Sequence, residues 1–421
     1  MIQRPRGTRD LLPPDTRLWQ AVEQAARDVF GAFGAEEIRT PVFEATELFV
    51  RSVGETTDIV HKEMYTFPDR KERSLTLRPE GTAGVARAWI ENGLSDRSHP
   101  LRLYYIGPMF RYERMQRGRY RQFSQIGLEV LGADTPLSDA ELILAMHEFF
   151  LRLGFTDLVI HLNNLGDPDD RPRYQDALRA ALEPRRGELC SDCQRRLDEN
   201  PLRILDCKVP SCQVVAADAP TMDDVAGDAS RTHVAEVERH LGRLGVPTVR
   251  NRRLVRGLDY YVRTVFEVVS PQLGTNTVLC GGGRYDRLIA DLGGPVLPGT
   301  GFAIGEDRVV DVLPERFKQT VLTRPRLYLV PLGAAAQERA LELARTWVHD
   351  GVPVEIEVTG RSLKAALKRA DREGFRAVAI LGEDELRRGE VTVRDLAAGS
   401  QATLAPAVVP EWWRGLIEAS S

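Results

Sequence analysis

The spacing of apolar residues changes several times along the chain, and each change predicts a different kind of element. Residues 17–33 carry apolar side chains three and four positions apart, which predicts an amphipathic helix. Residues 101–110 and 123–131 are rich in aromatic and β-branched side chains and predict two strands. A polar, arginine-rich stretch lies between these strands, so the simplest interpretation is a long antiparallel hairpin.

Strand signals give way to charged helical patterns between about 167 and 245. We interpret residues 170–246 as a mostly helical insertion into a domain that spans residues 1–325. After the insertion, the sequence predicts strands at 253–269 and 277–279, a glycine turn at 281–283, a helix from Tyr285, a strand and a helix around 302–313, and a linker over 313–326.

Beyond the expected linker, strands and helices alternate regularly. The predicted order is a strand at 327–331, a helix at 334–349, a strand at 353–358, a helix at 362–373, a strand at 377–381 and a strand pair near 390–404. This alternation is typical of an α/β domain with a mainly parallel sheet, here residues 326–421. The helix at 362–373 has basic residues on one side and apolar residues on the other, which in an isolated helix usually marks a solvated surface.

Composition narrows the classes of protein that fit this outline. The chain has 421 residues, more than a single core usually holds, and 43% of them are hydrophobic and 28% charged. A formal net charge of −4 argues against a protein that coats nucleic acid non-specifically, although local basic surfaces remain compatible with it. We expect no membrane helix and no secretory signal, because no long apolar run follows the N-terminal arginines or occurs elsewhere.

Two features of the predicted hairpin indicate a binding site. In the second strand, Gln125, Gly127 and Glu129 share the face opposite the core, and the glycine is expected to leave room for a small ligand. The connecting stretch carries five arginines, whose planar side chains match phosphate oxygens: Arg111, Arg114, Arg117, Arg119 and Arg121. A polar strand face or a basic loop alone is often only solvated surface. The phosphate-loop motif is absent, so any polyphosphate would have to be held by arginines.

Four of the five cysteines form two close pairs in the predicted insertion: Cys190, Cys193, Cys207 and Cys212. Four thiolates are the number that a structural, tetrahedral zinc ion requires. The second pair is separated by four residues, which is longer than the usual two, and free intracellular cysteines are common. Zinc binding and free thiols therefore both remain possible, while Cys280 is expected in the core.

Several segments together resemble the class II aminoacyl-tRNA synthetases, and specifically the histidyl-tRNA synthetase family, over nearly the whole chain. The hairpin from Gly107 to Glu129 and residues 301–308 resemble general class II motifs. The segments LVRGLDYY (254–261) and GGGRYD (281–286) resemble motifs that are particular to the histidine enzymes. The resemblance implies an α+β catalytic domain with an antiparallel sheet and helices, a helical insertion, and a C-terminal α/β anticodon-binding domain.

The resemblance also implies a ligase that activates L-histidine with ATP and Mg²⁺ and transfers it to the 3′ end of tRNA(His), as a cytoplasmic homodimer. It implies Arg111 and Arg256 as catalytic residues. The residues it implies for histidine are Glu80, Thr82, Gln125, Glu129, Tyr260, Tyr261 and Tyr285, and those for ATP are Arg111, Glu113 and Arg308. Those for tRNA are Arg117, Arg119, Arg121, Arg361, Lys364, Lys368 and Arg372.

Three alternatives compete with this interpretation. The first is a non-catalytic, histidine-sensing regulatory paralogue; such paralogues lack the anticodon-binding part and often lose the ATP-site arginines, all of which are present here. The second is a class II synthetase for another amino acid, and the third is a pure RNA-binding module. The chain also departs from the family pattern in placing two acids, Glu306 and Asp307, directly before Arg308.

Overall fold

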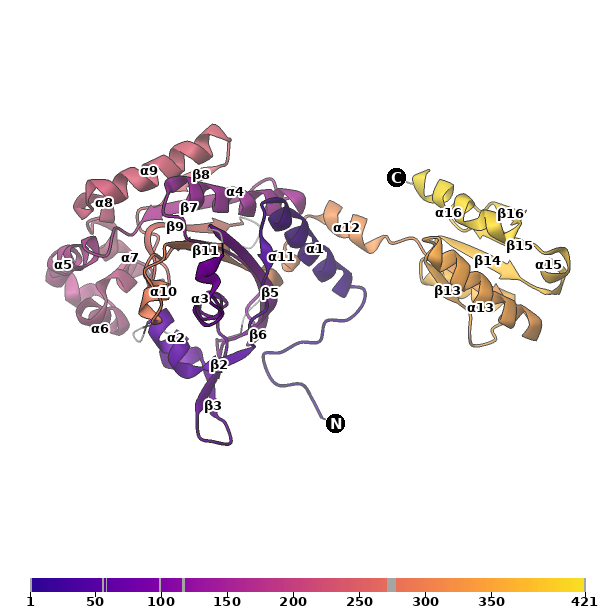
Figure 1. The fold of residues 1–421 in the computed structure, drawn as a ribbon, viewed down its shortest axis with the longest axis horizontal. Coiled ribbons are helices and arrows are strands. Elements are labelled where there is room, and N and C mark those ends of the chain that lie inside the picture. Colours follow the sequence, from indigo (N-terminus) through magenta and orange to yellow (C-terminus); the bar gives the residue numbers. More distant parts are fainter. Residues whose placement is uncertain are drawn as a thin grey trace. The chain divides into compact units, whose positions relative to one another are not determined.

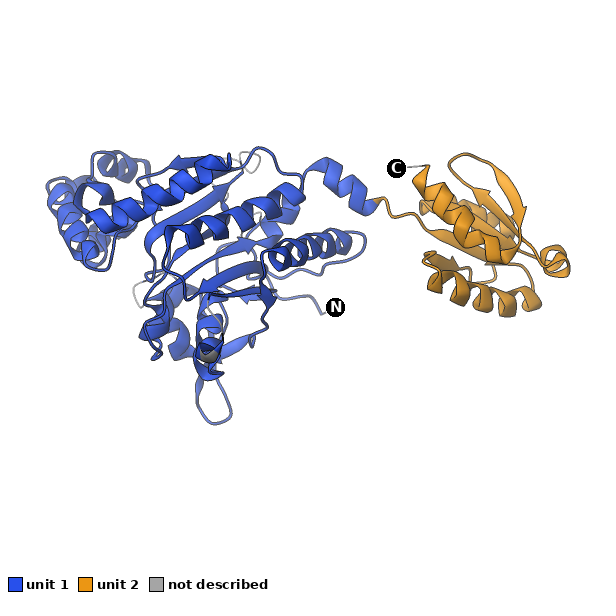
Figure 2. Cartoon of the chain, turned by 45° about the horizontal axis from the view of Figure 1, so that its top comes forward, with its two compact units in different colours: residues 1–322 blue, residues 323–421 orange. Residues whose placement is uncertain are grey.

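The computed structural model describes residues 2–54, 57, 59–97, 100–115, 118–270 and 278–419. The chain forms two compact units, residues 1–322 and residues 323–421 (Figure 2). Among the described residues, no helix is both long enough and apolar enough to span a membrane.

The first unit is built on an eight-stranded sheet with the order β1-β5-β6-β11-β10-β9-β7-β8 (Figure 1). The six central strands run antiparallel to one another. The edge strands β1 and β8 pair in parallel with β5 and β7, respectively. The strands are β1 Glu36–Glu37, β5 Leu101–Phe110, β6 Gln122–Leu131, β7 Val159–Asn164, β8 Thr248–Arg250, β9 Val262–Val269, β10 Val278–Arg284 and β11 Gly299–Gly305. The predicted hairpin is confirmed, with Gly107 of β5 opposite Gln125 of β6.

The two faces of this sheet have different roles. Helices α1 (Thr16–Ala32) and α4 (Pro136–Arg152) cover one face, where they share a hydrophobic core with Ile126, Leu128 and Val130 of β6. Helix α3 (Thr82–Glu91) lies against the other face and packs with side chains of β5 and with Tyr261 and Tyr285. A small antiparallel sheet of β2 Phe43–Ala45, β4 Ser74–Leu77 and β3 Tyr65–Pro68, the helix α2 Thr46–Val53 and the short helices α10 Leu288–Asp291 and α11 Glu306–Asp311 complete the arrangement.

Between β7 and β8 the described chain is helical. Figure 1 shows these helices gathered at one side of the sheet. They are α5 Asp170–Leu182, α6 Ser191–Glu199, α7 Pro210–Ala217, α8 Met222–Val225 and α9 Asp228–Arg243. Four of the insertion's cysteines and its apolar side chains form a hydrophobic cluster separate from the main core.

Three expectations for the first unit are wrong in detail. Residues 281–283 are not a turn; they lie inside strand β10, where the neighbouring strands and side chains approach too closely for a Cβ atom. Residues 253–261 form no strand, and β9 begins only at Val262. The expected linker contains the helix α12 (Glu315–Leu322), because Phe317, Val321 and Leu322 pack against the main core.

The second unit contains a five-stranded sheet with the order β13-β12-β14-β15-β16. The first three strands are parallel and the last two are antiparallel, so the predicted α/β domain with a mainly parallel sheet is confirmed. Its elements are β12 Leu327–Pro331, α13 Ala334–His349, β13 Val354–Ile356, α14 Leu363–Arg372, β14 Ala377–Leu381, α15 Glu383–Arg388, β15 Val391–Asp395, β16 Gln401–Leu404 and α16 Val409–Glu418.

Candidate active site

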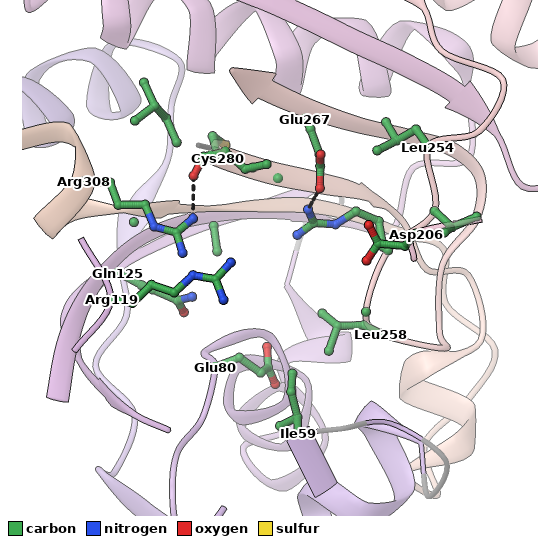
Figure 3. Close-up of a pocket in the computed structure, with 18 of the residues that line it drawn as sticks. Ile59, Glu80, Arg119, Gln125, Asp206, Leu254, Leu258, Glu267, Cys280 and Arg308 are labelled. Carbon is green, nitrogen blue, oxygen red and sulfur yellow. Dashed lines mark hydrogen bonds and ion pairs between the residues drawn. The ribbon is translucent and has the colours of Figure 1, made fainter. Parts of the chain in front are cut away.

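A cavity of about 620 Å³ opens on the polar side of the central sheet, beside the start of helix α3. Figure 3 shows Glu80 and Gln125 at this cavity, with Arg119 and Arg308 along one side and Asp206 across from them. Of the residues implied for histidine and ATP, the ones that line the cavity are Glu80, Thr82, Arg111, Glu113, Gln125, Arg256, Tyr260, Tyr261 and Arg308.

Glu129 and Tyr285 lie beneath the cavity and do not line it. The buried Glu129 carboxylate accepts hydrogen bonds from the Thr82 hydroxyl at 2.7 Å and from the Tyr285 hydroxyl. Burial raises the pKa of Glu129 to about 8, even though both hydrogen bonds act to lower it. No cation compensates this carboxylate in the described residues. A buried acid without a cation is a natural partner for a positively charged or N–H-rich ligand.

Glu80 fixes the entry of helix α3 into the site. Its carboxylate accepts the backbone N–H groups of Thr82 at 2.7 Å and of Ala83 at 2.9 Å. These two donors belong to the first turn of the helix and have no partner within it. Burial also raises the pKa of Glu80. Thr82 therefore connects two buried acids, since its backbone binds Glu80 and its hydroxyl binds Glu129.

Tyr105 occupies the space that was expected above Gly127. A Cβ atom on Gly127 would collide with the ring of Tyr105, so the glycine accommodates this ring and leaves no open floor for a ligand. The expectation of free space above Gly127 is therefore wrong. The polar atoms Tyr105 Oη, Tyr260 Oη and Gln125 Oε1 are buried and accept or donate no hydrogen bond in the described structure. Such groups are costly unless a ligand or water binds them.

Arg256 enters the cavity from the irregular segment that precedes β9. Its guanidinium forms an ion pair with Glu267 of β9 and lies directly over Gly281 of β10, where a Cβ atom would collide with it. The glycine in β10 thus makes room for a buried cation at the sheet surface. Figure 3 shows Glu267 on the far side of the cavity from Arg119 and Arg308.

Two more arginines complete the positive lining. Arg111 Nε donates to the carbonyl of Pro79 at 2.8 Å, and Arg308 Nη1 donates to the carbonyl of Val278 at 2.6 Å. Arg119 pairs with Glu113 at 3.2 Å. Burial, followed by the nearby charge of Arg119, lowers the pKa of Arg308 to about 10. A buried cation whose pKa is lowered by a neighbouring positive charge would be stabilised by an anion such as a phosphate chain.

The two acids before Arg308 do not neutralise it. Asp307 accepts from Arg9 at 2.7 Å and from the backbone N–H of Ser124 at 2.8 Å. Glu306 is fully buried, and burial raises its pKa well above the ordinary range. The guanidinium of Arg308 instead donates to backbone carbonyls of Val278 and Gly118. Arg308 consequently keeps its positive charge available to the cavity.

The residues implied for tRNA fall into different environments. Arg117 lies outside the described residues. Arg119 lines the cavity, whereas Arg121 stacks its guanidinium 3.7 Å from the ring centre of Tyr112. In the second unit, Arg361 pairs with Glu357 at 2.9 Å and Arg372 with Glu373 at 3.3 Å. Lys364 and Lys368 are exposed on helix α14, and neither forms an ion pair within the described chain.

Sequence reasoning missed three residues of this site. Tyr105 and Glu267 belong to strands, where only the tertiary arrangement decides which side chains face the cavity. Arg9, from the N-terminal segment, reaches Asp307 and Tyr120, and no local pattern indicates these distant contacts. The four clustered cysteines, by contrast, are brought together as their spacing allowed.

Comparisons with known proteins agree with this geometry. Residues 7–309 match the family described as "Histidyl-tRNA synthetase", and residues 326–415 match the "Anticodon binding domain". A histidine–tRNA ligase of Desulfitobacterium hafniense is 50% identical over 404 residues, which cover 96% of this chain and 95% of that protein. One of Syntrophotalea carbinolica is 48% identical over 400 residues, or 95% of each.

Solved structures give the same result. The crystal structure of apo S. aureus histidyl-tRNA synthetase matches with a TM-score of 0.81 at 36% identity, over 98% of this chain and 99% of that one. A structure described as an ATP phosphoribosyltransferase regulatory subunit/histidyl-tRNA synthetase from Bacillus halodurans matches with a TM-score of 0.67 at 22% identity, over 91% and 98%, and shows the fold alone. By its family match and its full-length relatives, the chain belongs to the histidyl-tRNA synthetase family.

Proposed function

We propose that this aminoacyl-tRNA ligase activates histidine with ATP in the cavity between Arg111, Arg256 and Arg308, and then transfers it to tRNA(His). One observation carries the assignment of the cavity: three buried or half-buried arginines and a set of unpartnered polar atoms line the same space. The arginines suit a triphosphate, and the polar atoms suit an amino acid.

For histidine, the proposal places the imidazole toward Glu129 and Tyr261 and the α-ammonium among Glu80, Thr82 and Gln125. A buried acid with a pKa near 8 is able to hold either form of the imidazole, because it donates a hydrogen bond when protonated and pairs with an imidazolium when ionised. Tyr260 and Tyr285 would define the walls. Ligands that leave these buried groups unpaired would be rejected strongly.

For ATP, we assign Arg111 to the α-phosphate, Arg308 to the γ-phosphate and Glu113 to the adenine amine. Arg256 would stabilise the charge that grows as the histidine carboxylate attacks the α-phosphate. No general base is needed, because that carboxylate is already a nucleophile. Rate enhancement then comes from in-line positioning and from fixed positive charge. A divalent ion, which we propose is Mg²⁺, would neutralise the pyrophosphate and be held mainly by phosphate oxygens and water.

The remaining parts of the proposal concern tRNA and assembly. We assign residues 1–325 to the catalytic domain, interrupted by the insertion 170–246, and residues 326–421 to anticodon binding. The basic side of helix α14, with Arg361, Lys364, Lys368 and Arg372, would contact tRNA phosphates, as would Arg117, Arg119 and Arg121. A homodimer in the cytoplasm follows from the family resemblance.

The regulatory alternative has the same fold, so fold alone does not separate it from a ligase. What favours the ligase is the retention of the anticodon-binding part, which such paralogues lack, and of the ATP-site arginines, which they often lose. Residues 326–415 match the anticodon-binding family, and Arg111, Arg256 and Arg308 all line the cavity. A regulator would have no use for an anticodon-binding domain.

The direct test is ATP–pyrophosphate exchange on the purified full-length chain without tRNA. We expect exchange that depends on histidine and is not supported by the other standard amino acids. Aminoacylation of tRNA(His) should follow when tRNA is added. Histidine binding without exchange would support the regulatory paralogue, and exchange with a different amino acid would overturn the pocket assignment.

A further inference from the structure

The cysteines of the insertion converge on one point away from the residues assigned to the reaction. The sulfur atoms of Cys190, Cys193, Cys207 and Cys212 all lie within 4.8 Å of one another. The Cys190 and Cys207 sulfurs are 3.9 Å apart. A tetrahedral zinc ion with Zn–S bonds of about 2.3 Å places its sulfurs about 3.8 Å apart, so the arrangement has the size that zinc requires.

Two helix ends and a backbone N–H group face this cluster. Cys193 and Cys212 each occupy the third position of a helix, α6 and α7 respectively, so the positive ends of two helices approach the sulfurs. The backbone N–H of Cys190 donates to the Cys212 sulfur at 3.2 Å. Positive helix ends and N–H donors stabilise negative sulfur, which is the form that binds a metal.

Packing alone is a weaker explanation for this arrangement. Cysteine often fills a core as a small apolar residue, and three of these four are buried. However, the insertion is made of short helices around its own small cluster, and small cores of this kind commonly depend on a metal or on disulfides. Four sulfurs from two separated chain segments meeting at one point are the usual form of such a structural metal site.

We propose that the helical insertion binds one zinc ion through the thiolates of Cys190, Cys193, Cys207 and Cys212, and that this ion holds one wall of the catalytic cavity in place. Binding releases the protons of the four thiols and changes no oxidation state. The site is distinct from the cavity, and the claim about the wall rests on the proposed function.

The chain between the two cysteine pairs provides the link to the cavity. Leu205 and Asp206 of this segment line the cavity, as does Lys208, which directly follows Cys207. Arg203 donates to the backbone carbonyl of Arg256 at 3.1 Å. Cross-linking the ends of this segment through a metal would therefore restrict both the cavity wall and the backbone that carries Arg256.

Metal content of the full-length chain, purified under reducing conditions, tests the site directly. We expect about one zinc per chain by elemental analysis, and Co²⁺ replacement should give the visible absorption of a tetrahedral tetrathiolate complex. The variant Cys207→Ser/Cys212→Ser should lose the metal, whereas the matched control Cys280→Ala should retain it. Wild-type chain that takes up no zinc, or that forms a Cys190–Cys207 disulfide instead, would overturn the proposal.

Removal and return of the metal test the link to catalysis in wild-type protein, so they do not depend on whether a variant folds. Chelation should lower the rate of histidine-dependent exchange several-fold, and added Zn²⁺ should restore it. An unchanged rate in zinc-free enzyme would overturn the role of the ion in the cavity wall. The outcomes are separable from the proposed function: zinc binding without exchange contradicts the function, and exchange without zinc contradicts the site.

Discussion

Two buried carboxylates, one in each unit, are built alike and yet differ in charge. Glu129 accepts a hydrogen bond from Tyr285, and Glu357 accepts one from Tyr328. Burial would raise the pKa of both. At Glu357, hydrogen bonds from Thr359, Tyr328 and Arg361 overcome burial and lower the pKa far below its usual range. At Glu129 no guanidinium is present, and the pKa is about 8.

The two carboxylates differ in whether the chain itself supplies the charge that neutralises them. Arg361 lies 2.9 Å and Arg369 3.6 Å from Glu357, so the chain itself supplies the compensating charge. In the first unit, no guanidinium pairs with Glu129, and among the described residues the cavity-lining Arg308 pairs with no carboxylate. A ligand that carries an amine, an imidazole and a triphosphate would supply what is missing on both sides.

The largest effect should come from removing the positive charge that we propose acts at the reacting atoms. Arg256→Ala should lower the exchange rate about 100- to 1,000-fold, because the fixed charge acts mainly on the transition state. The Michaelis constant for histidine should change much less. Pyrophosphate exchange at varied histidine concentrations measures both quantities. Arg102→Ala, which removes another half-buried arginine from an ion pair with Glu141, is the matched control and should retain the wild-type rate. A near-normal rate for Arg256→Ala would remove this residue from its assigned role.

Neutralising each carboxylate in turn tests the comparison itself. Glu129→Gln should raise the Michaelis constant for histidine about 10- to 100-fold and weaken discrimination against other amino acids, because it alters the carboxylate that we propose binds the imidazole. Glu357→Gln should leave exchange unchanged and lower the stability of the second unit, since two arginines lose a buried acid. Exchange kinetics and thermal unfolding distinguish the two variants. Equal effects of both on histidine would refute the assignment of Glu129.

Much of this site could be predicted from local sequence, because strand periodicity decides which side chains share a face. Gln125 and Glu129 lie two pleats apart in β6, and the structure places both on the side opposite the core residues Ile126 and Leu128. The cysteine cluster could also be predicted, because the two members of each pair are close in sequence and the fold has only to bring the two pairs together.

The errors arise where distant neighbours decide the structure. Consecutive glycines usually indicate a turn, but in β10 they accommodate the Arg256 guanidinium and the adjacent strands. The stretch 253–261 has a strand-like composition because four of its side chains (Leu254, Val255, Tyr260 and Tyr261) are buried beside the cavity, and burial in irregular backbone selects similar side chains. Pro314 favours a linker in the sequence, although proline is well tolerated just before a helix such as α12. None of these neighbours could be identified from local spacing.

A smaller effect is expected from substitutions on the basic side of helix α14, whose residues are predicted to have unequal roles. Arg361 belongs to the neutralised Glu357 cluster, whereas Lys364 and Lys368 are exposed and free to meet phosphates. Lys364→Ala/Lys368→Ala should raise the Michaelis constant for tRNA about three- to tenfold without altering exchange, and the difference from wild type should shrink as the salt concentration rises. Arg387→Ala/Arg388→Ala on helix α15 is the control of equal charge. Equal effects of the two variants on aminoacylation would mean that this surface of α14 is only solvated and does not contact tRNA.

The smallest effect is a pH dependence of stability that should appear for Glu129 alone. Its pKa is raised to about 8 in the folded chain, so the folded state keeps a proton that the unfolded state has already released. Stability from this group is therefore fully present below the unfolded pKa of about 4.3 and is lost progressively up to about pH 8. Glutamine does not titrate, so the melting temperature of Glu129→Gln relative to wild type should rise by a few degrees between pH 5 and pH 8. For Glu357→Gln the difference from wild type should stay flat over the same interval, because the lowered pKa of Glu357 confines its titration to more acidic solutions. Scanning calorimetry of the three proteins measures both trends. A difference between Glu129→Gln and wild type that stays flat from pH 5 to pH 8 would mean that the pKa of Glu129 is not raised in the folded chain.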